Sequence, residues 1–278
     1  MLNRMTVLIL ALLIVFSATV SAEEMPREDT PACEIKLLID SDQALDGNQL
    51  LAESIQDQFQ TGNEYKTYGV TYLDTPDRDY LNAGWINRIR MKDGKSKYTL
   101  TYKKRYPVEN NDIDAALKKA SEDGFSLSDP DFSAEIDWGY TKMTLSFSRD
   151  VTVKSAELPD IDHLGTNDAA GMIEEHMPSL EKNWKEDSET ADPVQIAGPI
   201  HFLRYSGTFD GQDIQFEIWP VPAGEDIENI VELSVKCESP EAAAEIRGSI
   251  VEALDEMGIL LHRDTLKTQM ILGAFNGA

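Results

Sequence analysis

The sequence has little of what most cofactor and metal sites are built from. It lacks a glycine-rich phosphate loop, a nucleophile elbow and a zinc motif. Its four histidines are scattered without metal-ligand spacing, so we interpret them as structural or surface groups. These absences leave carboxylates, lysines and arginines as the candidate functional groups.

Basic residues are few. The chain has 25 Lys and Arg against 50 Asp and Glu, a formal net charge of −25. Such a charge repels nucleic acid and anionic membranes, so we expect no nucleic-acid partner, and no membrane partner for the mature chain. Because salt screens exposed charges beyond a Debye length, a local basic cleft remains compatible with this acidity.

Long apolar runs are absent beyond the first 22 residues. The run at positions 7–16 follows Arg4 and is succeeded by small residues ending in Ala22. A basic start, a short apolar run and a small-residue cleavage site are typical of a secretory signal peptide. We predict a signal peptide at 1–22 and a mature protein exported to a periplasm or out of the cell. An uncleaved N-terminal anchor is the alternative.

Cysteine is almost absent, with only Cys33 and Cys237. An even count in an exported chain favours a disulfide between them. That bond would close a loop of about 200 residues and restrict the unfolded chain. Two buried free thiols are the alternative.

Strand-like and helix-like segments follow an acidic N-terminal lead at 23–32 without any long linker, so we predict one domain at 33–278. Asp93-Gly94 and Asp210-Gly211 are hairpin signals between strand-like runs. Repeated hairpins with a few helices favour an α+β fold, an antiparallel β-barrel with peripheral helices, over a Rossmann fold. The acidic stretch 181–192 is predicted as a polar loop, and 266–272 as a last extended segment.

Charged residues recur at the spacing of a strand face. The period of two places Arg88 with Arg90 on one face of a strand, Lys103 on a face of the next, and Glu135 with Asp137 on a third. Charges on a hairpin are usually solvated, but here the opposite faces carry large apolar groups that must be buried. A closed barrel would gather these charges in one polar tunnel, where basic groups hold phosphoryl oxygens and carboxylates hold a metal.

The stretch 72–90, which reads YLDTPDRDYLNAGWINRIR, resembles the stretch of the CYTH (triphosphate tunnel) family written Y-F-D-T-P, then Ala-Gly, then R-x-R. The stretch 99–103, TLTYK, is similar to the T-L-T-x-K element that follows it in the family. Weaker matches extend over nearly the whole mature chain. They are Glu34, Arg204, Glu217, Glu232 and Lys267.

The resemblance implies a closed antiparallel tunnel and a small phosphorylated or polyphosphate ligand. Family members include inorganic, thiamine and RNA triphosphatases and a class of adenylate cyclase. The residues expected to bind phosphate are Arg88, Arg90, Lys103, Arg204 and Lys267. Those expected to bind Mg²⁺ or Mn²⁺ are Glu34, Glu135, Asp137, Glu217 and Glu232, and the expected catalytic set is Arg88, Arg90 and Glu232.

The chain departs from the family pattern at two acids. The first-strand motif E-x-E-x-K reads Glu34, Lys36 and Leu38 at its three fixed positions, and the late E-x-E motif reads Glu232 and Ser234. Losing two carboxylates removes negative charge where a dication would lie, so we expect metal affinity to fall.

Three functions follow from these features. The first is an exported, metal-dependent hydrolase of triphosphate or polyphosphate. The second is a binding module that keeps the basic tunnel without cleaving its ligand, and the third is a structural scaffold on the same fold.

Overall fold

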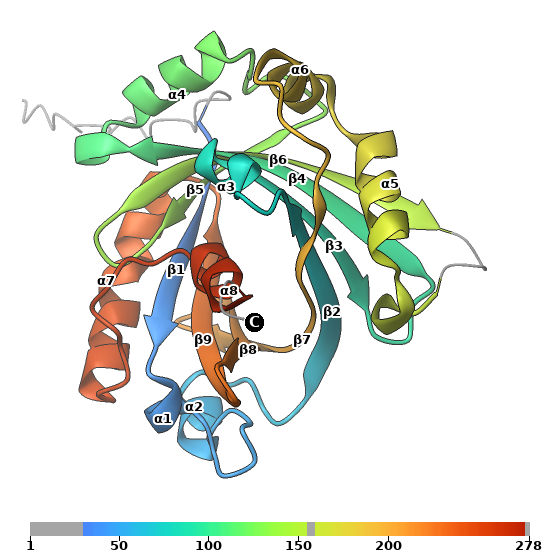
Figure 1. The fold of residues 1–278 in the computed structure, drawn as a ribbon. Helices are drawn as coiled ribbons and strands as arrows, with labels where there is room; N and C mark the ends of the chain where they lie inside the picture. The colour runs from blue at the N-terminus through green and yellow to red at the C-terminus, as the bar shows by residue number, and fades with distance from the viewer. Residues whose placement is uncertain (1–29, 155–158, 276–278) are drawn as a thin grey trace, which may run out of the picture.

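The computed structural model describes residues 30–154 and 159–275. The predicted signal peptide lies outside them, as does most of the predicted acidic lead. Strands form a closed barrel in the order β1-β5-β6-β4-β3-β2-β7-β8-β9, surrounded by helices (Figure 1). The strands are β1 (Ala32–Ile39), β2 (Tyr65–Asp74), β3 (Trp85–Lys92), β4 (Lys97–Val108), β5 (Ser133–Trp138), β6 (Met143–Lys154), β7 (Val194–Phe209), β8 (Gln212–Ala223) and β9 (Asp226–Cys237). The helices are α1 (Ser41–Ala44), α2 (Glu53–Gln58), α3 (Asp79–Asn82), α4 (Ile113–Glu122), α5 (Thr166–His176), α6 (Ser179–Asp187), α7 (Pro240–Glu256) and α8 (Lys267–Ala274).

The predicted α+β barrel is confirmed, with one difference in strand direction. All neighbouring strands pair antiparallel except β1 and β5, which run parallel from Ala32 opposite Glu135 to Ile35 opposite Trp138. Long segments separate these two strands in sequence, so no hairpin imposes an antiparallel pair. β1 also pairs antiparallel with β9, and it thereby closes the barrel.

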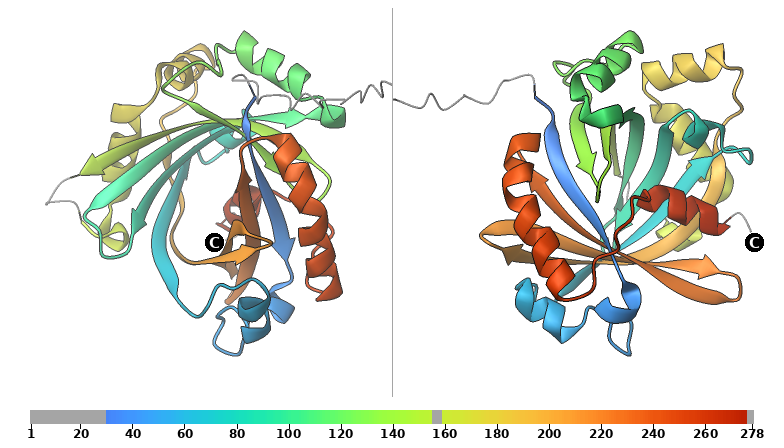
Figure 2. Two further views of the ribbon diagram at one scale, coloured as in Figure 1. Left: turned by 180° about the vertical axis from the view of Figure 1, so that it is seen from behind. Right: turned by 90° about the vertical axis from the view of Figure 1, so that its left-hand side faces the viewer.

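Most of the apolar core lies outside the barrel. Side chains of a strand alternate between the two faces of the sheet. Ile89 of β3, Leu100 of β4 and Leu233 of β9 are fully buried in a cluster that includes residues of the surrounding helices. Helix α7 packs along β1 and β9, while α4 and α5 contact strands of another part of the wall (Figure 2). A large part of the barrel interior is thereby left for polar groups.

Helix α8 contributes to a second apolar cluster, and Figure 1 shows the helix in front of the barrel opening. Ile271 and Leu272 pack with inward-facing residues such as Val70 and Trp219. The prediction of an extended segment at 266–272 is therefore wrong. The apolar residues Met270, Ile271 and Ala274 recur at helical spacing and not with the alternation of a strand.

The acidic stretch at 181–192 was also predicted wrongly, because its first half belongs to α6. Trp184 packs edge-on against Tyr80, with ring centroids 5.0 Å apart. Glu181 is fully buried and accepts a hydrogen bond from Asn87 Nδ2 at 2.7 Å. Polar composition suggested a loop, whereas one buried carboxyl group and one aromatic contact fix a helix against β3.

The predicted disulfide is not present, because both cysteines are free thiols. Cys33 lies opposite Cys237 in the β1–β9 pair. Burial raises the pKa of the Cys33 thiol to about 12, which keeps it protonated and unreactive.

None of the helices within residues 30–154 and 159–275 has the length and hydropathy needed to span a bilayer.

The buried carboxyl group of Glu181 should make the free energy of unfolding depend on pH. Burial raises its pKa to about 8, so the folded protein keeps this carboxyl group protonated over a range in which the unfolded chain ionises it. Its contribution to stability is fully present below about pH 4.5 and is lost as pH rises through 8. Glu181→Gln cannot ionise and keeps an acceptor for Asn87. We expect the variant to exceed the wild type by a few kcal/mol at pH 8.5 and by much less at pH 5.

Urea denaturation followed by tryptophan fluorescence at both pH values measures this difference. Glu186→Gln, an exposed change on the same helix, is the control and should show no pH-dependent gain. A gain of equal size at pH 5 and pH 8.5 would contradict the assignment of a raised pKa to Glu181.

Candidate functional site

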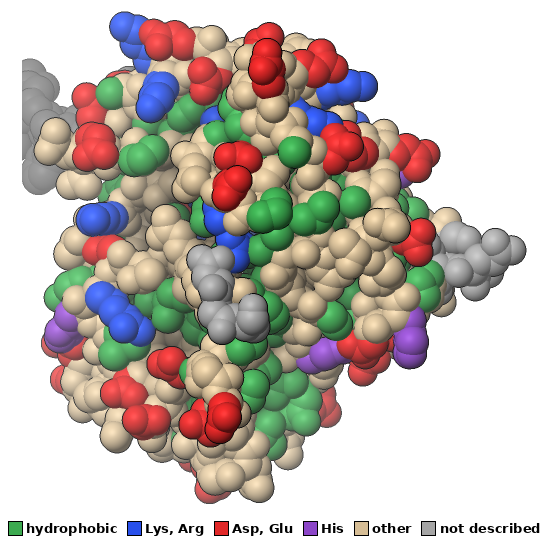
Figure 3. Space-filling model, in the orientation of Figure 1, with side chains coloured by type: hydrophobic (Ala, Val, Ile, Leu, Met, Phe, Trp, Pro, Cys, Tyr) green, Lys and Arg blue, Asp and Glu red, His purple; other side chains and the backbone are tan. Residues whose placement is uncertain are grey.

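The barrel encloses a cavity of about 660 Å³ whose charge is opposite to that of the chain. Ten basic and seven acidic side chains line it, although the whole chain carries a net charge of −25. On the face shown in Figure 3, acidic side chains are scattered among hydrophobic and some basic ones. The protein therefore presents a negative exterior and a net positive interior, which favours small anions inside the barrel.

Two adjacent strands supply the main group of cations. Arg88 and Arg90 of β3, with Lys103 and Arg105 of β4, all line the cavity. In the β3–β4 pair Arg88 lies opposite Thr101, and Ile86 lies opposite Lys103. Residues two apart on a strand share a face, and directly opposed residues do too, so this register gathers the four cations on one wall. We refer to Arg88, Arg90, Lys103 and Arg105 as the β3–β4 cations.

The β3–β4 cations have few negative partners. Burial, followed by the positive charges of Arg88 and Arg204, lowers the pKa of Arg90 to about 10. Burial also lowers the pKa of Lys103 to about 8. Within the described part of the chain, the buried Nε atoms of Arg88 and Arg105 have no hydrogen-bond partner. A bound anion would satisfy these donors and offset their mutual repulsion.

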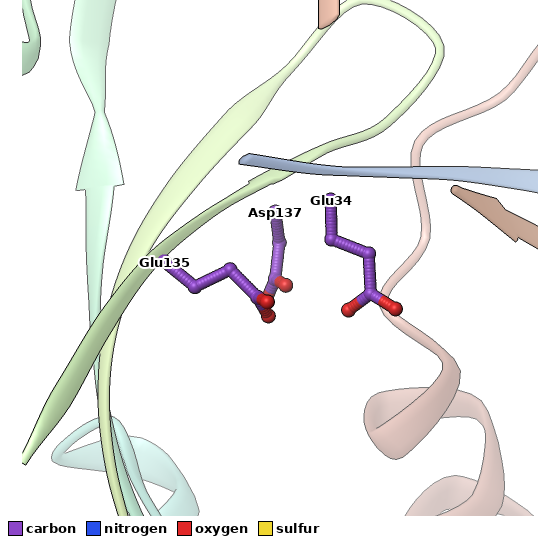
Figure 4. A group of neighbouring side chains, drawn as sticks. All are labelled: Glu34, Glu135 and Asp137. Atoms are coloured by element: carbon purple, nitrogen blue, oxygen red, sulfur yellow. The ribbon is translucent and has the colours of Figure 1, made fainter. Parts of the chain in front are cut away.

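A group of three carboxylates lies beside these cations, with Asp137 Oδ2 3.7 Å from Lys103 Nζ and 3.9 Å from Arg105 Nε. Glu34 of β1 with Glu135 and Asp137 of β5 place carboxylate oxygens within 4.8 Å of one another (Figure 4). The parallel β1–β5 pair brings them together, because Glu34 lies opposite Asp137. We call these three residues the acid triad. Burial alone raises the pKa of Asp137, but Lys103, Lys36 and Arg105 outweigh it and hold that pKa well below its usual range.

The acid triad is the type of oxygen donor set that Mg²⁺ and Mn²⁺ prefer, but a lysine already lies among its carboxylates. Lys36 Nζ is 2.7 Å from Glu34 Oε2, 2.5 Å from Asp137 Oδ1 and 3.9 Å from Glu135 Oε1. Ser234, the second departure from the family pattern, lies opposite Lys36 and also lines the cavity. With Lys36 in this position the residues present do not fit a divalent ion.

The other two predicted metal ligands are engaged by a second lysine. Glu217 and Glu232 lie directly opposite each other in the β8–β9 pair. Lys267, the first residue of α8, contacts both, with Nζ 2.7 Å from Glu232 Oε1. Arg204 Nε donates to Glu217 Oε1 at 2.9 Å, and Trp219 Nε1 donates to Oε2 at 2.9 Å. Burial raises the pKa of Glu217, but Lys267 and Arg204 outweigh it and lower the pKa far below its usual value.

All the predicted site residues therefore line one cavity, but they belong to different groups. Arg204 and Lys267 are bound to carboxylates and are less available to a ligand than the β3–β4 cations. Arg105 was not among the predicted site residues. It is two residues beyond Lys103 on the same strand, so the period of two was a sufficient signal for it. The ion pairs of Lys36 had no such signal, because they depend on the long-range β1–β5 pair.

Lys267 is predicted to stabilise the barrel. Two carboxylates in direct opposition repel each other, and removing the ammonium between them leaves buried charge without a partner. We expect Lys267→Met to lower the free energy of unfolding by about 3–5 kcal/mol. Adding Glu232→Gln should recover part of this loss. Lys118→Met on the exposed side of α4 is the control and should change stability by about 0.5 kcal/mol or less. Urea denaturation at pH 7 tests the set, and an unchanged midpoint for Lys267→Met would contradict it.

Comparison with known proteins supports the fold assignment. No family model and no curated protein matches this sequence. Among solved structures, HpAC1 from Hippeastrum, described as an adenylyl cyclase candidate with a dominant triphosphatase activity, is similar, with 17% identity and a TM-score of 0.51. The similarity covers 86% of this chain and 94% of HpAC1. An adenylate cyclase candidate from Bacillus halodurans matches with 14% identity and a TM-score of 0.51, over 87% of this chain and 96% of that one. The chain thus shares the fold of these two structures, in agreement with the closed barrel that the sequence predicted.

Proposed function

We propose that the barrel binds a phosphate-rich anion, of the size of inorganic triphosphate or a short polyphosphate, against its β3–β4 cations. The observation that carries the proposal is the group of buried cations, two of which have no negative partner in the described part of the chain, while the other two share Asp137. Arg88 and Arg90 form no ion pair within the described residues, and the Nε atoms of Arg88 and Arg105 lack any hydrogen bond there.

The chemistry of the lining favours phosphoryl groups over other anions. A guanidinium group presents a planar fork of donors that matches phosphate oxygens, and three of the four β3–β4 cations are arginines. A chain of phosphoryl groups concentrates several negative charges along a narrow rod, which fits an enclosed cavity with excess positive charge. A barrel that served only as a scaffold would gain nothing from buried, unsatisfied guanidinium nitrogens, because these cost stability.

Hydrolysis of the bound anion is the second candidate. It is supported by the triphosphatase activity in the description of HpAC1 and by the acid triad. A dependence on Mg²⁺ or Mn²⁺ would require the triad to hold the ion, and Lys36 opposes this. Binding without turnover is therefore the function that the geometry favours. Export, inferred from residues 1–22, is part of the proposal and would put the ligand in a periplasm or outside the cell.

We expect inorganic tripolyphosphate to bind the mature protein with one site per chain in isothermal titration calorimetry. Arg88→Ala and Arg90→Ala should each weaken binding roughly tenfold or more, a loss of about 1.4 kcal/mol, because each removes a buried charged donor. Lys118→Ala removes the same charge from an exposed position of α4 and is the matched control. It should leave the affinity unchanged.

Two further results decide between the candidates. If the wild type does not bind tripolyphosphate at millimolar concentration in low salt, the proposal is wrong. Release of phosphate in the presence of Mg²⁺ or Mn²⁺, abolished by Arg90→Ala, would establish the hydrolase. Binding without phosphate release in either metal would establish the module.

A further inference from the structure

Lys36 does more than replace a carboxylate of the family motif, because its side chain occupies the centre of the acid triad. Its side chain leaves β1 on the same face as Glu34 and lies beside two carboxylates that come from different strands. The Nζ atom is within 2.7 Å of Glu34 and 2.5 Å of Asp137. These distances are those of charge-assisted hydrogen bonds. The lysine therefore points into the acid triad and contacts the oxygens that a bound metal would contact.

Three carboxylates surround the side-chain nitrogen of Lys36, with Glu34, Glu135 and Asp137 each placing an oxygen within 4 Å of Nζ. Carboxylates at this distance favour the ammonium form of a lysine. An ammonium group thus lies among the triad. A divalent cation bound to the same oxygens would be a few ångströms from this charge, and the two would repel strongly in the barrel interior.

Three further basic side chains also lie beside carboxylates of the acid triad. Lys103 Nζ lies 3.7 Å and Arg105 Nε 3.9 Å from Asp137 Oδ2. Lys236 Nζ donates to Glu135 Oε2 at 2.9 Å. Four cations therefore lie beside the three carboxylates, and of these four Lys36 is the one within 4 Å of all three acids.

The second pair of acids shows the same arrangement independently. Lys267 lies between Glu217 and Glu232, and Arg204 takes the remaining oxygen of Glu217. All five carboxylates predicted as metal ligands thus have a lysine or arginine as their nearest charged partner. The same arrangement, a lysine between carboxylates of different strands, therefore occurs at two places in the cavity lining.

We propose that the ammonium group of Lys36 takes the place of a divalent metal in the acid triad, so that this barrel binds its phosphate-rich anion without Mg²⁺ or Mn²⁺. The inference rests on the proposed function for the identity of the anion, but the statement about the metal stands on the triad alone. Lys36 holds the three carboxylates together through ion pairs, as a bound metal would hold them through coordination.

Titration of Mn²⁺ into the mature protein without phosphate tests the metal statement directly. The wild type should show no stoichiometric site at millimolar Mn²⁺. Lys36→Met removes the ammonium and keeps an unbranched side chain, so this variant should gain one site per chain and bind Mn²⁺ roughly 100-fold more tightly than the wild type. Adding Glu34→Gln to Lys36→Met should weaken that new site again.

Matched variants separate the loss of Lys36 from a general loss of positive charge. Lys36→Arg keeps the charge and should gain no site. Lys236→Met removes a lysine that also contacts the triad but is 71% exposed, and it should gain none while Lys36 is present. If Lys36→Met fails to fold by circular dichroism, Lys36→Gln, which retains a hydrogen-bond donor, takes its place.

A stoichiometric Mn²⁺ site in the wild type, as tight as that of Lys36→Met, would overturn the inference. So would a folded Lys36→Met or Lys36→Gln protein that binds no more Mn²⁺ than the wild type. In a separate titration, tripolyphosphate should bind the wild type in the presence of EDTA. If it binds only when Mg²⁺ or Mn²⁺ is added, the inference fails and the proposed anion-binding function survives; if it binds under neither condition, the proposed function itself fails.

Discussion

The alternation of side chains along a strand is the constraint on which the rest of this structure depends. A closed sheet has one face inside and one outside, and these strands direct their charged residues inward. The apolar face is consequently outside and must be covered, which is the role of α1, α2 and α4–α7. The interior then holds charges that water solvates poorly, so each charge requires a partner from another strand or from a ligand.

The pairing of these interior charges is uneven, and this unevenness is the basis of the proposed anion site. Carboxylates from β1, β5, β8 and β9 are engaged by Lys36, Lys236, Lys267 and Arg204. On the β3–β4 wall, cations outnumber the carboxylates near them. A strongly acidic chain thereby contains a local excess of positive charge, enclosed where salt screens it little. The net charge led us to expect no nucleic-acid or membrane partner, but it could not describe this interior.

The features that the sequence predicted best are those that depend on residues close together in the chain, such as turns and strand faces. The Asp93-Gly94 and Asp210-Gly211 turns connect β3 to β4 and β7 to β8, and the period of two correctly grouped the residues that share a strand face. What it could not predict depends on distant contacts. The parallel β1–β5 pair, the burial of Glu181 under α6 and the two clusters around Lys36 and Lys267 each join residues far apart in the chain. Helix α8 was misassigned although its apolar spacing was helical, because its short apolar segment also fits a strand.

The proposed anion site and the acid triad are built from different strands, although Lys103 and Arg105 of the first contact Asp137 of the second. The β3–β4 cations come from one hairpin, whose local register alone places them together. The acid triad requires β1 to lie beside β5, and a single side chain on β1 determines whether its oxygens face a lysine or an ion. We therefore expect a substitution at position 36 to change metal binding while the β3–β4 hairpin, the proposed anion site, keeps its register. The fold shared with a described triphosphatase accordingly fixes the shape of the tunnel and leaves the reaction to be decided by residues such as Lys36.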